Sequence, residues 1–312
     1  MRTASCTLAV LIAIAGQQQD RTPEATSLLG RPLFTPEQSP AARKKAEAEL
    51  TQAEAVYKHK PDDADAIIWL GRRTAYLGRY REAIQIFSDG IQKHPQDARM
   101  YRHRGHRYIT VRELDRAITD LARASRLISD KPDQTEPDGQ PNARNIPTST
   151  LNSNIYYHLG LAHYLKGDFE SASRAYRHCM DYSKNPDMLV ATTHWHYMTL
   201  RRLQRDDEAR RLLGPISASI DIIENASYHK LLLMYKGLEK AETLLASAAE
   251  GIDAVTISYG VGNWYLYNGR RDDAISVFRK IVDERPAFWS AFGYIAAEAE
   301  LAPGRGTPRN AD

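Results

Sequence analysis

The chain has 312 residues, of which 42% are hydrophobic and 26% are charged, and this balance is typical of a folded protein. It excludes a chain that is disordered throughout. The formal net charge of +3 gives no strong overall attraction to nucleic acid or to an anionic membrane. Two cysteines, Cys6 and Cys179, are too few to build a framework of disulfides.

The N-terminus has the pattern of a secretory signal. Arg2 supplies a positive charge, residues 7–14 form a short apolar run, and Ala13 and Ala15 are small residues at a cleavage position. The run is too short to cross a bilayer core, which needs roughly 20 residues. Cys6 precedes the run, whereas the cysteine of a lipoprotein follows it. We therefore expect residues 1–15 to be a cleaved signal peptide, the protein to be periplasmic or secreted, and no stable membrane anchor.

The segments at either end of the central region differ from it in composition. Residues 16–43 are rich in Gln, Thr, Ser and Pro, which predicts a flexible linker. Its apolar residues are candidates for packing onto a first amphipathic helix at 41–58. A final apolar helix at 287–301 is predicted to cap the array, and residues 302–312 are predicted to be disordered. The candidates in the linker are Leu28, Leu29, Leu33 and Phe34.

A repeat organises the chain between these segments. Gly71 is predicted to lie where two helices of a hairpin approach closely, with Ala83 small for the same reason on the second helix. Gly78 is placed in the turn, where a positive φ is easily adopted, and Pro95 ends the second helix. The full set of matching positions in residues 64–97 is Leu70, Gly71, Gly78, Tyr80, Ala83, Phe87, Gly90 and Pro95.

The same spacing recurs along the chain. It is found again from residue 98, from residue 159 and over residues 255–288, while residues 190–213 and 227–249 keep only part of it. Residues 132–152 interrupt the phase with four prolines and no periodicity, which predicts a loop inserted between repeats. We expect an all-α region over residues 44–301 with about five helix pairs.

These positions resemble the tetratricopeptide repeat (TPR), a 34-residue helical hairpin. The resemblance covers roughly residues 64–290 and implies a right-handed α-solenoid with a C-terminal capping helix. A narrower resemblance is to the NlpI-type periplasmic proteins, and it implies an envelope adaptor that brings cell-wall hydrolases to a protease. This chain lacks that family's lipoprotein cysteine and adds the insert. The segments that carry the narrower resemblance are 157–176, 195–213, 227–245 and 259–278.

The first helices of stacked hairpins line a concave groove, so the phase predicts which side chains a partner would meet. Arginines gather at one end and aromatic residues follow, which favours an acidic or C-terminal peptide as the partner. The arginine-rich unit, with nine Lys/Arg against four Asp/Glu in residues 98–131, is alternatively a solvated face. The candidate groove residues are Arg72, Tyr76, Arg99, Arg102, His106, Tyr157, Tyr164, His194, Arg201, Tyr259, Asn263 and Tyr267.

Motifs for catalysis or for a cofactor are missing from the sequence. It has no P-loop, dinucleotide glycine motif, HExxH, CxxC or GxSxG, so we expect neither an enzyme nor a cofactor. His194 and His196 are two positions apart, which directs them to different faces of a helix. The primary hypothesis is an exported TPR scaffold or adaptor for envelope protein or cell-wall enzyme turnover. Two rivals are a ligand- or metal-binding solenoid around His194, Trp195 and His196, and a structural subunit of a multiprotein complex.

Overall fold

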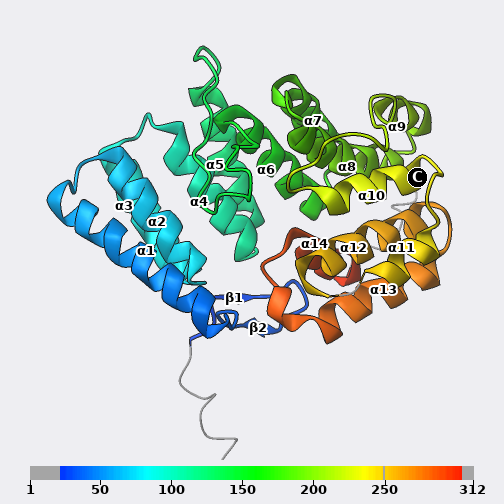
Figure 1. Cartoon of the computed structure of the whole chain (residues 1–312), viewed down its shortest axis with the longest axis horizontal. Coiled ribbons are helices and arrows are strands. Elements are labelled where there is room, and N and C mark those ends of the chain that lie inside the picture. The colour runs from blue at the N-terminus through cyan, green and yellow to red at the C-terminus, as the bar shows by residue number, and fades with distance from the viewer. Residues whose placement is uncertain (1–21, 249, 304–312) are drawn as a thin grey trace, which may run out of the picture.

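The structure is a computed structural model that describes residues 22–248 and 250–303. The described residues form fourteen helices and one two-stranded sheet. Figure 1 shows the helices as a curved array whose last members turn back toward the first, with the short strands between the two ends. The all-α prediction is confirmed. Six helix pairs are present in these residues where about five were expected.

The pairs follow one another in chain order after a single long helix. The strands are β1 (Ala25–Thr26) and β2 (Pro32–Leu33), and the long helix is α1 (Pro40–His59). The pairs are α2 (Ala64–Tyr76) with α3 (Tyr80–Lys93), α4 (Ala98–Thr110) with α5 (Leu114–Leu127), α6 (Leu151–Lys166) with α7 (Phe169–Tyr182), α8 (Pro186–Arg202) with α9 (Asp206–Leu212), α10 (Ala226–Tyr235) with α11 (Ala241–Ser247), and α12 (Gly251–Tyr267) with α13 (Arg271–Glu284). A 3₁₀ turn (Pro286–Phe288) and α14 (Phe292–Leu301) follow.

Local sequence explains where these helices begin and end. The Asp63 side chain accepts a hydrogen bond from the Ala66 N–H at 2.8 Å and so caps α2. Thr150 and Ser153 form a reciprocal capping box at the start of α6. Gly78 and Gly167 follow α2 and α6 with φ of 76° and 82°, a conformation that glycine adopts without strain.

Each regular hairpin is held together by a glycine on its first helix and a large side chain on its second. A Cβ on Gly105 would lie 2.7 Å from Leu121, and one on Gly160 would lie 2.7 Å from Tyr176. No side chain fits at such a distance, so the backbone of the first helix packs directly against a side chain of the second helix. The same contact joins Gly71 to Phe87 and Gly262 to Phe278.

The first helices of the pairs form an inner row that closes on itself. In this row α12 contacts α8, and α14 contacts both α12 and α6, although these helices are far apart in the chain. A buried ion pair fastens the closure: the Arg112 Nη2 lies 2.8 Å from a carboxylate oxygen of Glu298 on α14. Arg112 also donates to the carbonyl of Trp289 at 2.7 Å. The array is therefore more tightly curled than a solenoid with an open groove.

The segment before α1 is fixed to the C-terminal helices, so the predicted flexible linker over residues 16–43 is wrong for residues 22–43. The Leu28 N–H donates to Glu298 at 3.2 Å, and the Trp289 indole N–H donates to the carbonyl of Phe34 at 2.7 Å. Leu33 belongs to the main hydrophobic core, with Leu28 and Leu29 packed against it. Figure 1 shows this hairpin between the first helices and the last.

Three sequence predictions lie partly or wholly outside the described residues. These are the signal peptide at 1–15, residues 16–21 of the linker, and residues 304–312 of the tail. Among the residues that are described, no helix combines the length and the apolar character needed to span a membrane.

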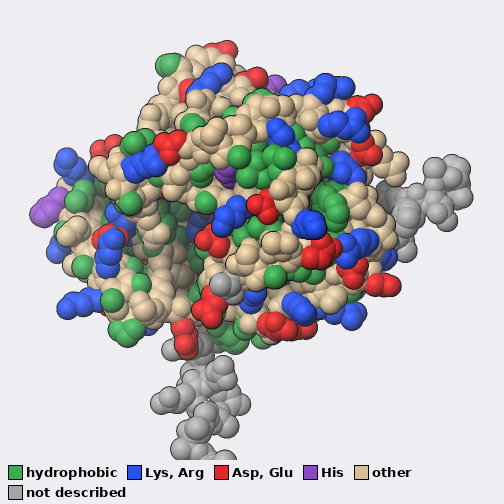
Figure 2. All heavy atoms as spheres, turned by 45° about the vertical axis from the view of Figure 1, so that its right-hand side comes forward, with side chains coloured by type: hydrophobic (Ala, Val, Ile, Leu, Met, Phe, Trp, Pro, Cys, Tyr) green, Lys and Arg blue, Asp and Glu red, His purple; other side chains and the backbone are tan. Residues whose placement is uncertain are grey.

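Figure 2 shows acidic and basic side chains interspersed over one face of the molecule, with a hollow beside the N-terminal helices.

Candidate functional site

The inserted loop folds back over the inner row and encloses a pocket. The pocket has a volume of about 340 Å³ and is lined by α2, α4, the start of α6 and the insert. Thr135 pairs with Thr150 in an isolated β-bridge, and the Glu136 N–H donates to the Ser149 carbonyl at 3.2 Å. The predicted loop at 132–152 ends at Thr150, because Leu151 begins α6. We call residues 134–141, which cover the pocket, the strap.

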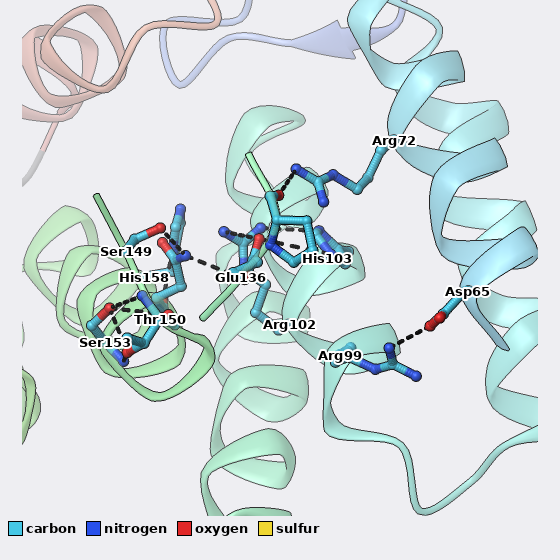
Figure 3. A network of polar contacts seen from close by, with 12 residues as sticks. Asp65, Arg72, Arg99, Arg102, His103, Glu136, Ser149, Thr150, Ser153 and His158 are labelled. Carbon is cyan, nitrogen blue, oxygen red and sulfur yellow. Dashed lines mark hydrogen bonds and ion pairs between the residues drawn. The ribbon is translucent and has the colours of Figure 1, made fainter. Parts of the chain in front are cut away.

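Glu136 places a carboxylate inside the pocket. One of its oxygens lies 3.0 Å from the Arg102 guanidinium, and both side chains are about nine-tenths buried, with 10% and 9% of their surface exposed. The other oxygen accepts a hydrogen bond from the Asn154 side chain at 3.2 Å. Figure 3 shows Glu136 directed between Arg102 and His103. This face of α4 thus binds a carboxylate, and in this structure the carboxylate comes from the chain itself.

Two further arginines hold the strap by its backbone. Arg72 donates to the carbonyl of Pro137 at 2.9 Å, and Arg73 donates to the carbonyl of Gly139 at 2.8 Å. The contact at Gly139 is close: a Cβ there would lie 1.8 Å from the Tyr76 hydroxyl oxygen. The groove side of α2 therefore recognises an extended backbone, while α4 recognises a carboxylate.

Positive charge remains in the pocket after Glu136 is paired. Arg107 lines it and is half-buried, and its guanidinium has no hydrogen bond or ion pair within the described residues. The guanidinium lies over the Tyr80 ring, 5.6 Å from the ring centre. Burial lowers the pKa of Arg107 to about 10, so it stays protonated at neutral pH. The Nε–H of Arg102 is also buried without a partner among the described residues.

The histidines around these arginines add no charge. Burial, reinforced by the neighbouring Arg102 and Arg107, holds the pKa of His103, His106 and His158 well below the usual range. His106 packs against His158, with ring centres 4.3 Å apart. The pocket therefore presents fixed guanidinium charge beside neutral imidazoles, which suits binding of an anionic group.

Four of the predicted groove residues lie in this pocket, namely Arg72, Tyr76, Arg102 and His106. Arg99 does not: its guanidinium lies 2.6 Å from Asp97 and 2.5 Å from Asp65. Figure 3 shows the Arg99–Asp65 pair apart from the Glu136 group.

The other predicted groove residues do not line an accessible surface, and the prediction is wrong for five of them. Tyr157, Tyr164, His194, Tyr259 and Asn263 are buried, because the inner row closes over them. The Tyr164 hydroxyl, for example, bonds to the Tyr259 hydroxyl and to the Asn263 amide, each at 2.8 Å.

Arg201 and Tyr267 keep partial exposure but are engaged with each other. The Arg201 guanidinium lies 4.5 Å from the centre of the Tyr267 ring and 2.7 Å from Asp206.

The repeat phase does not predict Glu136 and Arg107 as members of the site. The acidic stretch Thr-Glu-Pro-Asp in an insert next to an arginine-rich unit is the signal that could have suggested the contact. Arg107 was counted only in the alternative of a solvated arginine face. Its position one residue after His106 places it at the edge of the inner face of α4.

The histidines of the rival metal hypothesis lie in the core. His194 stacks on Tyr228, with ring centres 4.7 Å apart, and His196 bonds to Ser173 at 3.2 Å. Within the described residues, no group of three or more His, Cys, Asp or Glu side chains is placed to hold a metal ion.

One spacing unites the hairpins. The glycine of each regular first helix contacts the side chain sixteen positions later, at Phe87, Leu121, Tyr176 and Phe278. Gly71 and Gly105 are 34 positions apart, and Gly160 and Gly262 are 102 apart, which is three units of 34. The family model of the tetratricopeptide repeat matches residues 153–186, the segment that contains α6 and α7. The chain therefore contains a segment that matches a tetratricopeptide repeat.

Solved structures that resemble this chain share low sequence identity with it. YrrB, described as a TPR protein with an unusual peptide-binding site, is 14% identical over 80% of this chain and 97% of its own, with a TM-score of 0.42. A Naa15/Naa10 structure bound to HypK-THB is 15% identical over 81% of this chain and 36% of its own, with a TM-score of 0.36. The APC/C hetero-tetramer Cut9–Hcn1 is 14% identical over 81% and 46%, with a TM-score of 0.35. No curated protein sequence matches the chain significantly.

Proposed function

We propose that this protein is a TPR interaction scaffold that binds an extended acidic segment of a partner protein in the pocket of α2 and α4. The proposal rests on the way in which the strap binds to α2 and α4. Its Glu136 carboxylate pairs with Arg102, and its Pro137 carbonyl accepts from Arg72. A partner segment with the same chemistry would find the same donors.

The unpaired guanidinium of Arg107 supports an acidic partner. A half-buried cation without a counter-charge has lost part of its hydration, and an incoming carboxylate would offset that cost. Guanidinium groups bind carboxylates through two parallel hydrogen bonds, which makes such contacts both strong and directional. The pocket has a volume of about 340 Å³, which is enough for a side-chain carboxylate next to Arg107.

A binding role fits the pocket better than catalysis does. Its histidines have pKa values well below the usual range because of burial, so they are poor proton carriers near neutral pH. Cys179 offers no reactive thiol, because it is buried in the core and burial raises its pKa to about 12.

The cellular setting is part of the proposal. We place the scaffold in the cell envelope, as an exported adaptor in envelope protein or cell-wall enzyme turnover. The apolar run at residues 7–14 and the resemblance to NlpI-type proteins support this setting. N-terminal sequencing of the protein from an expressing bacterium tests it: a mature N-terminus near Gly16 is expected, and a retained Met1 in the cytoplasmic fraction would contradict export.

Calorimetric titration with a Glu-rich octapeptide tests the proposed function. The peptide should bind, and Arg107→Gln should weaken binding about tenfold or more, because that substitution removes a half-buried, unpaired cation from the pocket. Arg126→Gln is the matched control, since Arg126 is exposed on α5. Equal loss of binding in the two variants would indicate general attraction to positive charge, and the pocket would then not be the binding site.

A further inference from the structure

We propose that the strap is a built-in competitor that occupies the pocket until an acidic partner displaces it. This inference rests on the proposed function, since it assigns the strap and the partner to the same cations. It adds a means of regulation: the partner must carry more carboxylate, or place it better, than the chain's own Thr135-Glu136-Pro137-Asp138-Gly139 segment.

The first support is that the strap binds as a ligand would. Its contacts with α2 and α4 are one carboxylate and two carbonyl oxygens, received by Arg102, Arg72 and Arg73. Every one of these acceptors exists in any extended acidic peptide. Partner and strap therefore compete for the same donors, and both cannot occupy them together.

The second support is that the strap is held mainly by polar contacts. None of the residues 132–150 belongs to a hydrophobic core cluster, and Ile146, a large apolar residue of the insert, is 50% exposed. Water can replace polar contacts on opening, and segments with few apolar contacts open at low free energy. Displacement of the strap thus costs far less than unfolding.

The third support is that the ends of the insert are anchored without the strap. Ala124 and Ile128 at its beginning pack with Leu151 and Ile155 at its end in a small separate core. These contacts hold α5 against α6 whether the strap is bound or free. Release of the strap therefore leaves the array intact, as a reversible switch requires.

Two variants release the strap by different means. Glu136→Gln removes the charge that pairs with Arg102 and keeps the shape of the side chain. Gly139→Ala keeps every charge and adds a Cβ that would collide with the Tyr76 hydroxyl. Gln134→Ala is the control, because Gln134 lies in the strap with an exposed side chain and does not line the pocket. The two mechanisms are independent, so a folding defect in one variant does not decide the result.

The experiment measures the affinity of each chain for the Glu-rich octapeptide, with hydrogen exchange of the Glu136 amide as a readout of strap release. Both releasing variants should exchange faster and bind about tenfold tighter or more than wild type and Gln134→Ala, because the strap no longer occupies the pocket in most molecules. Tight and equal binding by all four chains would overturn the strap as competitor while the proposed function stands. Faster exchange without peptide binding in any chain would overturn both.

Discussion

Arg112 and Glu298 show how single residues determine the closure of the molecule. Arg112 has a φ of 67°, which is unusual for a residue other than glycine, and its side chain is almost fully buried. Glu298 accepts hydrogen bonds from Arg112 and from the backbone of Leu28, and so joins the N-terminal segment, the α4–α5 turn and α14. Removing one charge leaves the other buried without a partner.

We therefore expect Glu298→Gln to lower the free energy of unfolding by about 3–5 kcal/mol. Urea denaturation measures the loss. The control is Asp283→Asn, which breaks the exposed pair with Arg31 and should leave stability nearly unchanged. A double variant, Arg112→Met with Glu298→Met, should recover much of the loss, because no unpaired charge remains. A change below about 1 kcal/mol in Glu298→Gln would show that the pair does not fasten the closure.

The buried histidines make stability depend on pH. Burial lowers the pKa of His194 to about 3 and of His196 to about 4, and it lowers the pKa of His103, His106 and His158 well below the usual range. Unfolded histidines have a pKa of about 6.5, so below that pH the unfolded chain takes up protons that the folded chain does not. Stability is therefore full above pH 6.5 and falls as the pH decreases.

Each such histidine should contribute a slope of about 1.4 kcal/mol per pH unit below pH 6.5. His194→Phe keeps an aromatic ring between Tyr228 and Tyr235. It should reduce the pH dependence of the free energy of unfolding by about 1.4 kcal/mol per pH unit, the contribution of one histidine. His59→Gln, which changes an exposed histidine, is the control. Urea titrations between pH 7 and pH 4.5 measure both slopes. Identical slopes in wild type and His194→Phe would mean that His194 is accessible to protons in the folded state.

At the scale of the hairpin, a glycine contact sets the distance between the helices. Gly105→Ala would bring a methyl group to 2.7 Å from Leu121. We expect it to destabilise the protein by about 1–3 kcal/mol through overpacking. In an ordinary helix the same substitution stabilises by roughly 0.5–1 kcal/mol, so the sign of the change is diagnostic. Thermal unfolding of Gly105→Ala, alone and with Leu121→Ala, measures it. Stabilisation by the single substitution would contradict the close contact.

The sequence predicted the regular hairpins because glycine and its partner recur in phase. It placed His194 incorrectly on the groove face. His194 lies 34 positions after Gly160, and Tyr228 lies 34 positions after His194, so both hold the phase of the hairpin glycines. Large rings at those positions stack on each other. Their second helices, α9 and α11, have only seven residues each, which weakened the pattern that the prediction used.

At the scale of the whole molecule, the closure could not be predicted from periodicity. The repeat pattern says which face of each helix is buried in its own hairpin and against its neighbours, but not which distant helices meet. Leu28 and Glu298 bond across 270 positions, and nothing in their surroundings marks them as partners. The composition of residues 16–43 indicated a linker, yet its few apolar residues suffice to dock the described part onto the C-terminal helices.

The same limit applied to the candidate site. Arg72 and Arg102 were predicted from their phase on the first helices, and they do line the pocket. Glu136 lies in an insert without periodicity, so its return to α4 depends on loop geometry that the phase does not encode. Tyr164 and Asn263 hold repeat positions that face the groove in an open solenoid. They are buried here, because the inner row closes over that part of the groove.

Hydrogen exchange on the wild-type chain, with and without the Glu-rich octapeptide, tests most directly that an acidic segment replaces the strap. The peptide should speed exchange at the amides of Glu136 and Leu151, which bond to Ser149 and Gln134 across the base of the insert. It should at the same time slow exchange in α2 and α4. Unchanged exchange at those two amides, at a peptide concentration that saturates binding, would contradict displacement of the strap by an acidic segment.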